Sequence, residues 1–108
     1  MAKPIDISPD EKAALDWIDT RADGMVATLK DWVRINSGSR NADGLERMRG
    51  ELERVFAETG GRIEAVELPP SEAVAPDGSV TQQAYTPSFH LSVRPDAEVK
   101  IVLTGHHD

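Results

Sequence analysis

The spacing of hydrophobic positions predicts a long helix in the first third of the chain. From Leu15 to Ile35, apolar residues recur at steps of three and four, the spacing that places them on one helix face. Residues 8–11 (Ser-Pro-Asp-Glu) precede this stripe and have the pattern of a capping box with proline at the first helical position. Gly24 interrupts the stripe and costs about 1 kcal/mol relative to alanine inside a helix, so a break there is the alternative. One continuous helix is favoured.

A second helix is expected after the polar loop of residues 36–41. Asp43, with Glu46 three residues later, offers an amino-terminal cap, and Gly60 with Gly61 offers a left-handed stop. The expected buried stripe consists of Leu45, Met48, Leu52, Val55 and Phe56. Arg and Glu residues fill the opposite face, which is typical of a helix surface exposed to solvent and stabilised by i, i+3 ion pairs.

Three strands are expected in the remainder of the chain. Residues 62–68 form a plausible strand, residues 69–83 read as a surface excursion rich in Pro, Asp, Gly and Ser, and residues 88–94 alternate between apolar and polar. Residues 95–98 predict a turn into the apolar run 99–104, which has the composition of a strand buried on both faces. The last two strands are expected to form an antiparallel hairpin. The predicted fold class is therefore α/β, with two amino-terminal helices followed by a three-stranded mixed sheet.

Composition excludes several kinds of partner and site. The 108-residue chain has a formal net charge of −7, which argues against binding to nucleic acid or to an anionic membrane surface. It contains no cysteine, so disulfides and thiolate zinc sites are excluded, and any metal ion must be held by histidine and carboxylate ligands. No secretory h-region and no membrane-spanning apolar stretch is present, so we expect a cytoplasmic protein.

The candidate chemistry lies at the end of the apolar run. In an extended chain, side chains at positions i and i+2 share a face, which places His106 beside Asp108 and turns His107 away. A carboxylate often orients a metal-binding histidine by accepting its second ring N–H. His106 is therefore a candidate metal ligand and Asp108 its orienting partner, whereas the alternative is a polar strand end. His90 is expected to face solvent, and residues 37–39 (Ser-Gly-Ser) are interpreted as a turn because they lack the flanking base of a nucleophilic serine.

Three segments together resemble the amino-terminal part of the M20 metallopeptidases, and the glutamate carboxypeptidase branch most. These are residues 32–39, the glycine-tipped helix of residues 45–60, and the apolar strand that runs into Gly105-His106-His107-Asp108. The resemblance implies that His106 binds one of two zinc ions and that Asp108 orients it. Cobalt or manganese would also suit such ligands. In the family, the remaining ligands and the glutamate general base follow this motif.

The resemblance implies that residues 1–108 are the amino-terminal portion of a catalytic domain, without its remainder and without the dimerisation domain. The parent enzyme would hydrolyse an amide bond next to a free carboxylate, as a carboxypeptidase, dipeptidase or deacylase. Its substrates would be small peptides or N-acyl amino acids, and the full-length protein would be a homodimer. The 108-residue chain alone is expected to be catalytically inactive and, because residues 99–104 lack cover, to self-associate. The alternative function is a self-contained α/β interaction module.

Overall fold

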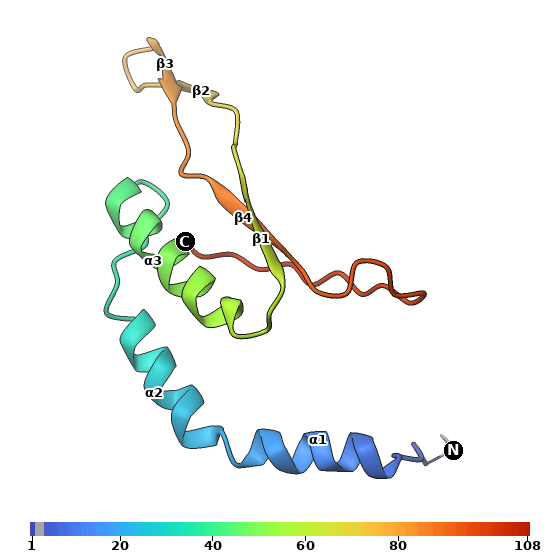
Figure 1. Cartoon of the computed structure of the whole chain (residues 1–108). Coiled ribbons are helices and arrows are strands. Elements are labelled where there is room, and N and C mark those ends of the chain that lie inside the picture. Colours follow the sequence, from blue (N-terminus) through green and yellow to red (C-terminus); the bar gives the residue numbers. More distant parts are fainter. Residues whose placement is uncertain (2–3) are drawn as a thin grey trace. The chain divides into compact units, whose positions relative to one another are not determined.

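The computed structural model describes residues 1 and 4–108, and this part of the chain contains three helices and two small antiparallel sheets (Figure 1). The chain divides into two compact units, Met1–Arg34 and Ile35–Asp108. The first unit holds two of the helices, and the second holds the third helix and both sheets. None of the helices in the described residues is long and apolar enough to cross a membrane.

The first unit consists of α1 (Pro9–Asp19) and α2 (Ala22–Trp32). The capping box is confirmed: the Ser8 amide donates to Glu11 Oε2 (2.8 Å), and the Glu11 amide donates to Ser8 Oγ (3.3 Å). The single long helix is wrong, because α1 ends before Thr20, whose hydroxyl donates to the Trp17 carbonyl at 2.6 Å. This local hydrogen bond competes with helix continuation. Neither helix buries a side chain, so packing does not override the local preference.

The second unit begins with α3 (Ala42–Ala57), the best-packed element. Its cap is Asn41 and not the predicted Asp43: Asn41 Oδ1 accepts a hydrogen bond from the Gly44 amide at 3.1 Å. The predicted stripe is confirmed at Leu45 and Met48, which are only 9% and 8% exposed, and Leu52 and Val55 are half-buried. The prediction is wrong for Phe56, which is 41% exposed near the end of the helix. Gly60, with φ of +71°, provides the predicted left-handed residue after the helix.

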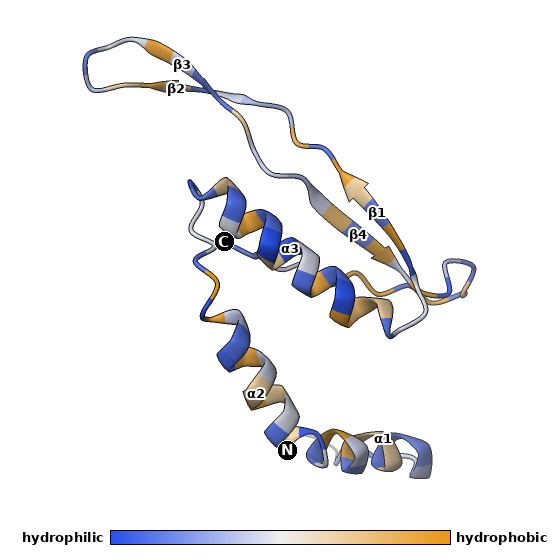
Figure 2. Ribbon diagram, turned by 60° about the vertical axis from the view of Figure 1, so that its left-hand side comes forward, coloured by the Kyte–Doolittle hydropathy of each residue, from blue (hydrophilic) through white to orange (hydrophobic). Residues whose placement is uncertain are grey.

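One sheet pairs β1 (Arg62–Val66) with β4 (Ser88–Ser92) in antiparallel register, with Arg62 opposite Ser92 and Val66 opposite Ser88. Hydrophobic and hydrophilic residues alternate along β4, whereas β1 ends in two consecutive hydrophobic residues, Ala65 and Val66 (Figure 2). Helix α3 contacts both strands, and the rings of Phe56 on α3 and Phe89 on β4 lie 6.3 Å apart between centroids, tilted by 52°. The most buried apolar side chains among the described residues, Leu45 and Met48, also belong to α3.

The second sheet lies within residues 69–83, the segment that the sequence assigns to a surface excursion. β2 (Ser71–Val74) pairs with β3 (Val80–Gln83) as an antiparallel hairpin. Gly78 has φ of +83° in the connecting turn, and Asp77 Oδ1 accepts hydrogen bonds from the Ser79 amide (2.9 Å) and hydroxyl (2.6 Å). Asp77 and Gly78 therefore form the turn of this hairpin, and the sequence-based prediction missed the strands on either side of it.

The predicted strand 99–104 and the three-stranded mixed sheet are wrong. Residues 99–104 have no regular secondary structure, and β4 pairs with β1 rather than with this segment. The apolar side chains of Val99, Ile101, Val102 and Leu103 are 79%, 82%, 84% and 90% exposed. A run rich in β-branched residues suits a strand that is covered on both faces, but a strand forms only when a neighbour accepts and donates its backbone hydrogen bonds. Among the described residues, no strand pairs with this run.

Candidate functional site

The site begins at the loop of residues 36–41, which is tied to the start of α3. Asn41 uses both ends of its side-chain amide: Oδ1 accepts from the Gly44 amide, and Nδ2 donates to the Asn36 carbonyl at 2.7 Å. The Asn41 amide also donates to the Gly38 carbonyl at 2.7 Å. These bonds close the loop around Ser39, which lies at a shallow depression of about 650 Å³. The position of Ser39 is thus set by the amino terminus of α3.

Asp108 lies between Ser39 and His106. The Ser39 hydroxyl donates to Asp108 Oδ2 at 2.7 Å, and Asp108 Oδ1 lies 3.4 Å from Nδ1 of His106. The first contact joins residues 69 positions apart in the chain, whereas the second is local. The two oxygens of one carboxylate therefore have different partners, a hydroxyl and an imidazole.

The electrostatics of the site favour an ionised Asp108. Hydrogen bonds from the Ser39 hydroxyl and from its own backbone amide, with a smaller contribution from the nearby His106, hold the pKa of the Asp108 carboxyl below its usual value. Asp108 Oδ1 lies on the Nδ1 side of the His106 ring, which leaves Nε2 on the side away from the carboxylate. The His106 side chain is 93% exposed, so that nitrogen is accessible.

The structure brings His106 and Asp108 together, as the i, i+2 argument predicts, and His107 is more buried than either. His90 is exposed on β4, which confirms the expectation for that residue. The metal-binding role of His106 and the orienting role of Asp108 stay predictions. Within residues 1 and 4–108, no group of three or more His, Asp or Glu side chains is placed to hold a metal ion.

Ser39 is the residue of this site that the sequence does not reveal. It is correctly expected in a turn, but its partner is distant in sequence, and no local spacing pattern connects residues 39 and 108. The available signal was the resemblance itself, because Ser39 lies in one of the three segments that carry it. Residues 32–39 and the segment that ends at Asp108 both carry the resemblance, so a contact between them could have been expected.

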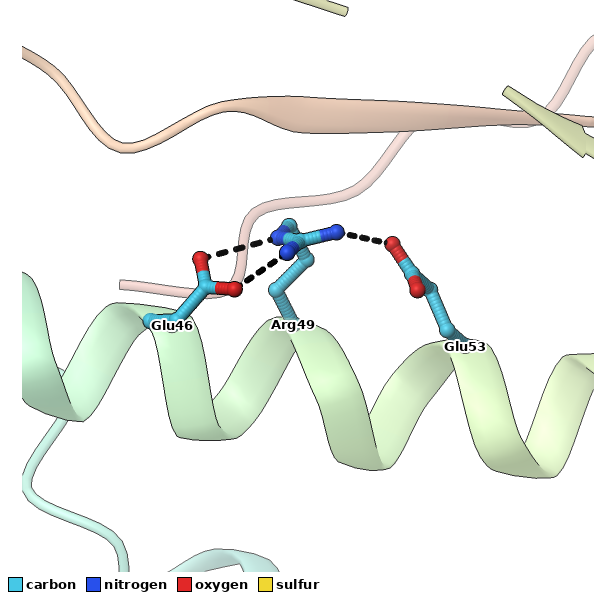
Figure 3. Close-up of polar contacts among 3 residues, drawn as sticks. All are labelled: Glu46, Arg49 and Glu53. Atoms are coloured by element: carbon cyan, nitrogen blue, oxygen red, sulfur yellow. Dashed lines mark hydrogen bonds and ion pairs between the residues drawn. The ribbon is translucent and has the colours of Figure 1, made fainter. Parts of the chain in front are cut away.

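A second charged cluster lies on α3, where Arg49 stands between Glu46 and Glu53 and pairs with both (Figure 3). The Arg49 side chain is 18% exposed and that of Glu46 is 53% exposed, so the predicted solvated face is covered at Arg49 and open at Glu46. The hydrogen bond from Arg49 lowers the pKa of Glu46, and the same bond is the main cause of the raised pKa of Arg49. Each charge stabilises the ionised form of the other, which is typical of a structural ion pair rather than an acid/base pair.

Comparisons of the chain with protein-family models, with curated proteins and with solved structures gave no match. The functional assignment therefore depends on the residues themselves, and in particular on the geometry of Ser39, Asp108 and His106.

Proposed function

We propose that this chain forms the amino-terminal part of an M20-like zinc hydrolase, in which His106 is a metal ligand and Asp108 its orienting carboxylate. The observation that carries the proposal is the arrangement of Asp108 Oδ1 against Nδ1 of His106, at 3.4 Å. Metal-binding histidines typically give one ring N–H to a carboxylate and bind the ion through the other nitrogen. The donor set fits zinc, because a histidine nitrogen backed by a carboxylate is a common zinc ligand.

The residues of this chain supply one metal ligand of such a site, His106, and the carboxylate that orients it, Asp108. Asp108 directs a proton to Nδ1 of His106, and the exposed Nε2 is left to bind the ion. Zinc, when bound, activates water and polarises the carbonyl of the scissile amide. A catalytic zinc ion needs about three protein ligands, and the described residues bring together only one candidate ligand and its carboxylate partner. We therefore expect weak metal binding and no peptidase turnover from the 108-residue chain.

The proposed reaction is hydrolysis of an amide bond next to a free carboxylate, in small peptides or N-acyl amino acids. The remaining ligands and the glutamate general base would follow the Gly-His-x-Asp motif, as they do in the family. We also propose a cytoplasmic location and a homodimeric full-length protein, and we expect no nucleic-acid partner because the net charge is −7.

Zinc titration of the ¹⁵N-labelled chain, followed through its imidazole resonances, tests the assignment of His106. We expect Nε2 of His106 to shift at lower zinc concentration than the ring nitrogens of His107, which adjoins it in sequence. His106→Ala should remove the tighter site, and His107→Ala, the matched control, should retain it. Equal responses of all three histidines would remove His106 from the metal site.

Activity is tested on the product of the complete reading frame. Metal analysis and a screen of N-acyl amino acids and dipeptides should detect zinc-dependent hydrolysis that is lost in His106→Ala. Unchanged metal content and activity in that variant would contradict the proposal.

A second candidate function, an interaction module, is favoured by the exposed apolar run of residues 99–103. The side chain of Leu103, at 90% exposure, is typical of the exposure along this run. Runs of this kind on soluble proteins mark association surfaces. This reading gains support if the complete protein binds no metal and associates through this run.

A further inference from the structure

The hydrogen bond from Ser39 to Asp108 connects the candidate metal site, His106 with Asp108, to α3, the best-packed element of the second unit. Ser39 Oγ lies 2.7 Å from Asp108 Oδ2, and the other carboxylate oxygen faces His106. A carboxylate with one partner can still turn about its Cβ–Cγ bond. With a donor on Oδ2, the plane of the group is fixed, and Oδ1 is held toward the imidazole.

The donor itself is firmly placed. The loop that carries Ser39 is closed by Asn41, whose side chain bonds both the Asn36 carbonyl and the Gly44 amide. Gly44 begins the buried side of α3, next to Leu45. A chain of contacts therefore leads from the core of the unit through the loop and the Ser39 hydroxyl to the carboxylate.

The direction of the hydrogen bond excludes the other chemical role of a serine beside a histidine. A nucleophilic serine gives its proton to a base that activates it, usually an imidazole. Here the Ser39 proton points to Asp108, and the imidazole of His106 lies on the other side of that carboxylate. Asp108 therefore links the Ser39 hydroxyl to the His106 ring.

We propose that Ser39 is a positioning residue: its hydroxyl orients the Asp108 carboxylate so that His106 keeps its proton on Nδ1 and presents Nε2. The orientation of the carboxylate is a property of the metal-free chain, whereas its use in metal binding rests on the proposed function.

The test is the tautomer of His106 in the ¹⁵N-labelled 108-residue chain without metal, at about pH 8, where an ordinary imidazole is neutral. Long-range ¹H–¹⁵N spectra report the fraction of Nδ1–H in each ring. We expect this fraction to be higher in His106 than in His107. Ser39→Ala should lower the His106 value to that of His107. Ser39→Thr, which keeps a hydroxyl, should preserve the wild-type value, and so should Ser37→Ala, the control in the same loop.

The inference is overturned if Ser39→Ala leaves the His106 tautomer unchanged or if Ser39→Thr fails to preserve it. Loss of the α3 amide signals in Ser39→Ala would also overturn it, because the serine would then be a folding residue. In zinc titration, removal of the direct partner of a ligand, here Asp108, costs about 10-fold or more in affinity. Because Ser39 acts on that partner, we expect a smaller loss of zinc affinity at His106 in Ser39→Ala and none in Ser37→Ala.

The two proposals fail separately. If Ser39→Ala changes the tautomer but zinc does not select His106, the positioning role stands and the metal site is wrong. If zinc selects His106 but the tautomer and the affinity do not respond to Ser39→Ala, the metal site stands and the positioning role is wrong.

Discussion

Gly44→Ala and Gly50→Ala place the same methyl group at two positions of α3 and are expected to have opposite effects. At Gly50, a Cβ atom would meet nothing within 4 Å. At Gly44, it would lie 2.8 Å from the Asn36 carbonyl carbon and 2.8 Å from Asn41 Nδ2, and closer still to the Asn36 carbonyl oxygen. Cβ atoms in proteins essentially never approach other heavy atoms within 3.0 Å, so the loop of residues 36–41 must move.

The expected energies follow from the contacts that this movement breaks. The bond from Asn41 Nδ2 to the Asn36 carbonyl and the cap from Asn41 Oδ1 to the Gly44 amide each contribute about 1 kcal/mol. Replacing glycine by alanine in a helix returns up to about 1 kcal/mol. Gly44→Ala should therefore destabilise α3 by about 1 kcal/mol, and Gly50→Ala should stabilise it by up to about the same amount.

Amide hydrogen exchange of α3 measures both effects in the same element. A difference of about 2 kcal/mol between the variants corresponds to roughly 30-fold in the opening equilibrium. Gly44→Ala should also shift the Asp108 and His106 resonances, because the Ser39 loop has moved, whereas Gly50→Ala should leave them unchanged. Equal protection of α3 in the two variants, or greater protection in Gly44→Ala, would refute the close approach of the loop to the helix.

Three further predictions concern other parts of the chain. Glu11 should titrate with a pKa below its ordinary value because the Ser8 backbone amide donates to its carboxylate, with a further contribution from the Ser8 side chain. The stabilisation of α1 is then complete above the ordinary pKa and is lost as pH falls through the lowered one, and a Glu11 carboxyl titration by NMR with an ordinary pKa would contradict this. Val102→Lys should weaken self-association in sedimentation velocity, because Val102 is 84% exposed and a charge there disfavours apolar contact between chains. An unchanged monomer fraction would show that residues 99–104 do not mediate self-association. Met48→Ala, which removes a side chain only 8% exposed, should cost about 2–5 kcal/mol in urea unfolding, and a cost below that range would mean that the core lies elsewhere.

The elements defined by local chemistry were predictable from the sequence. The capping box of residues 8–11 formed, the stripe of α3 is buried at Leu45 and Met48, and the glycine stop of the helix is present. Strands were also expected at the positions of β1 and β4. In each case the decisive interactions lie within a few residues, so periodicity and cap residues are sufficient.

The pairing of the strands was not predictable in the same way. Two strands with a turn between them favour a hairpin, and β4 with residues 99–104 has that pattern. In the structure, β4 pairs instead with β1, and the β2–β3 hairpin lies between these two strands in the sequence. The sequence Pro76-Asp77-Gly78 is a strong turn signal between residues of strand character, and it would have supported a hairpin there. The error came from treating a Pro- and Gly-rich segment as lacking strands.

The candidate site depends on one local contact and one long-range contact. The sequence predicted only the local contact, between His106 and Asp108. His106 and Asp108 come together through an i, i+2 relation that survives without a regular strand, because two residues of extended backbone are enough to place side chains on one face. The Ser39 contact needs the loop, its cap and α3 to be in place first. The local pair contains the proposed metal ligand, His106, and the long-range hydrogen bond from Ser39 fixes Asp108 to the folded unit. Since the segment between β4 and Asp108 has no regular structure, the orientation of the pair depends on Ser39 more than it would at the end of a paired strand.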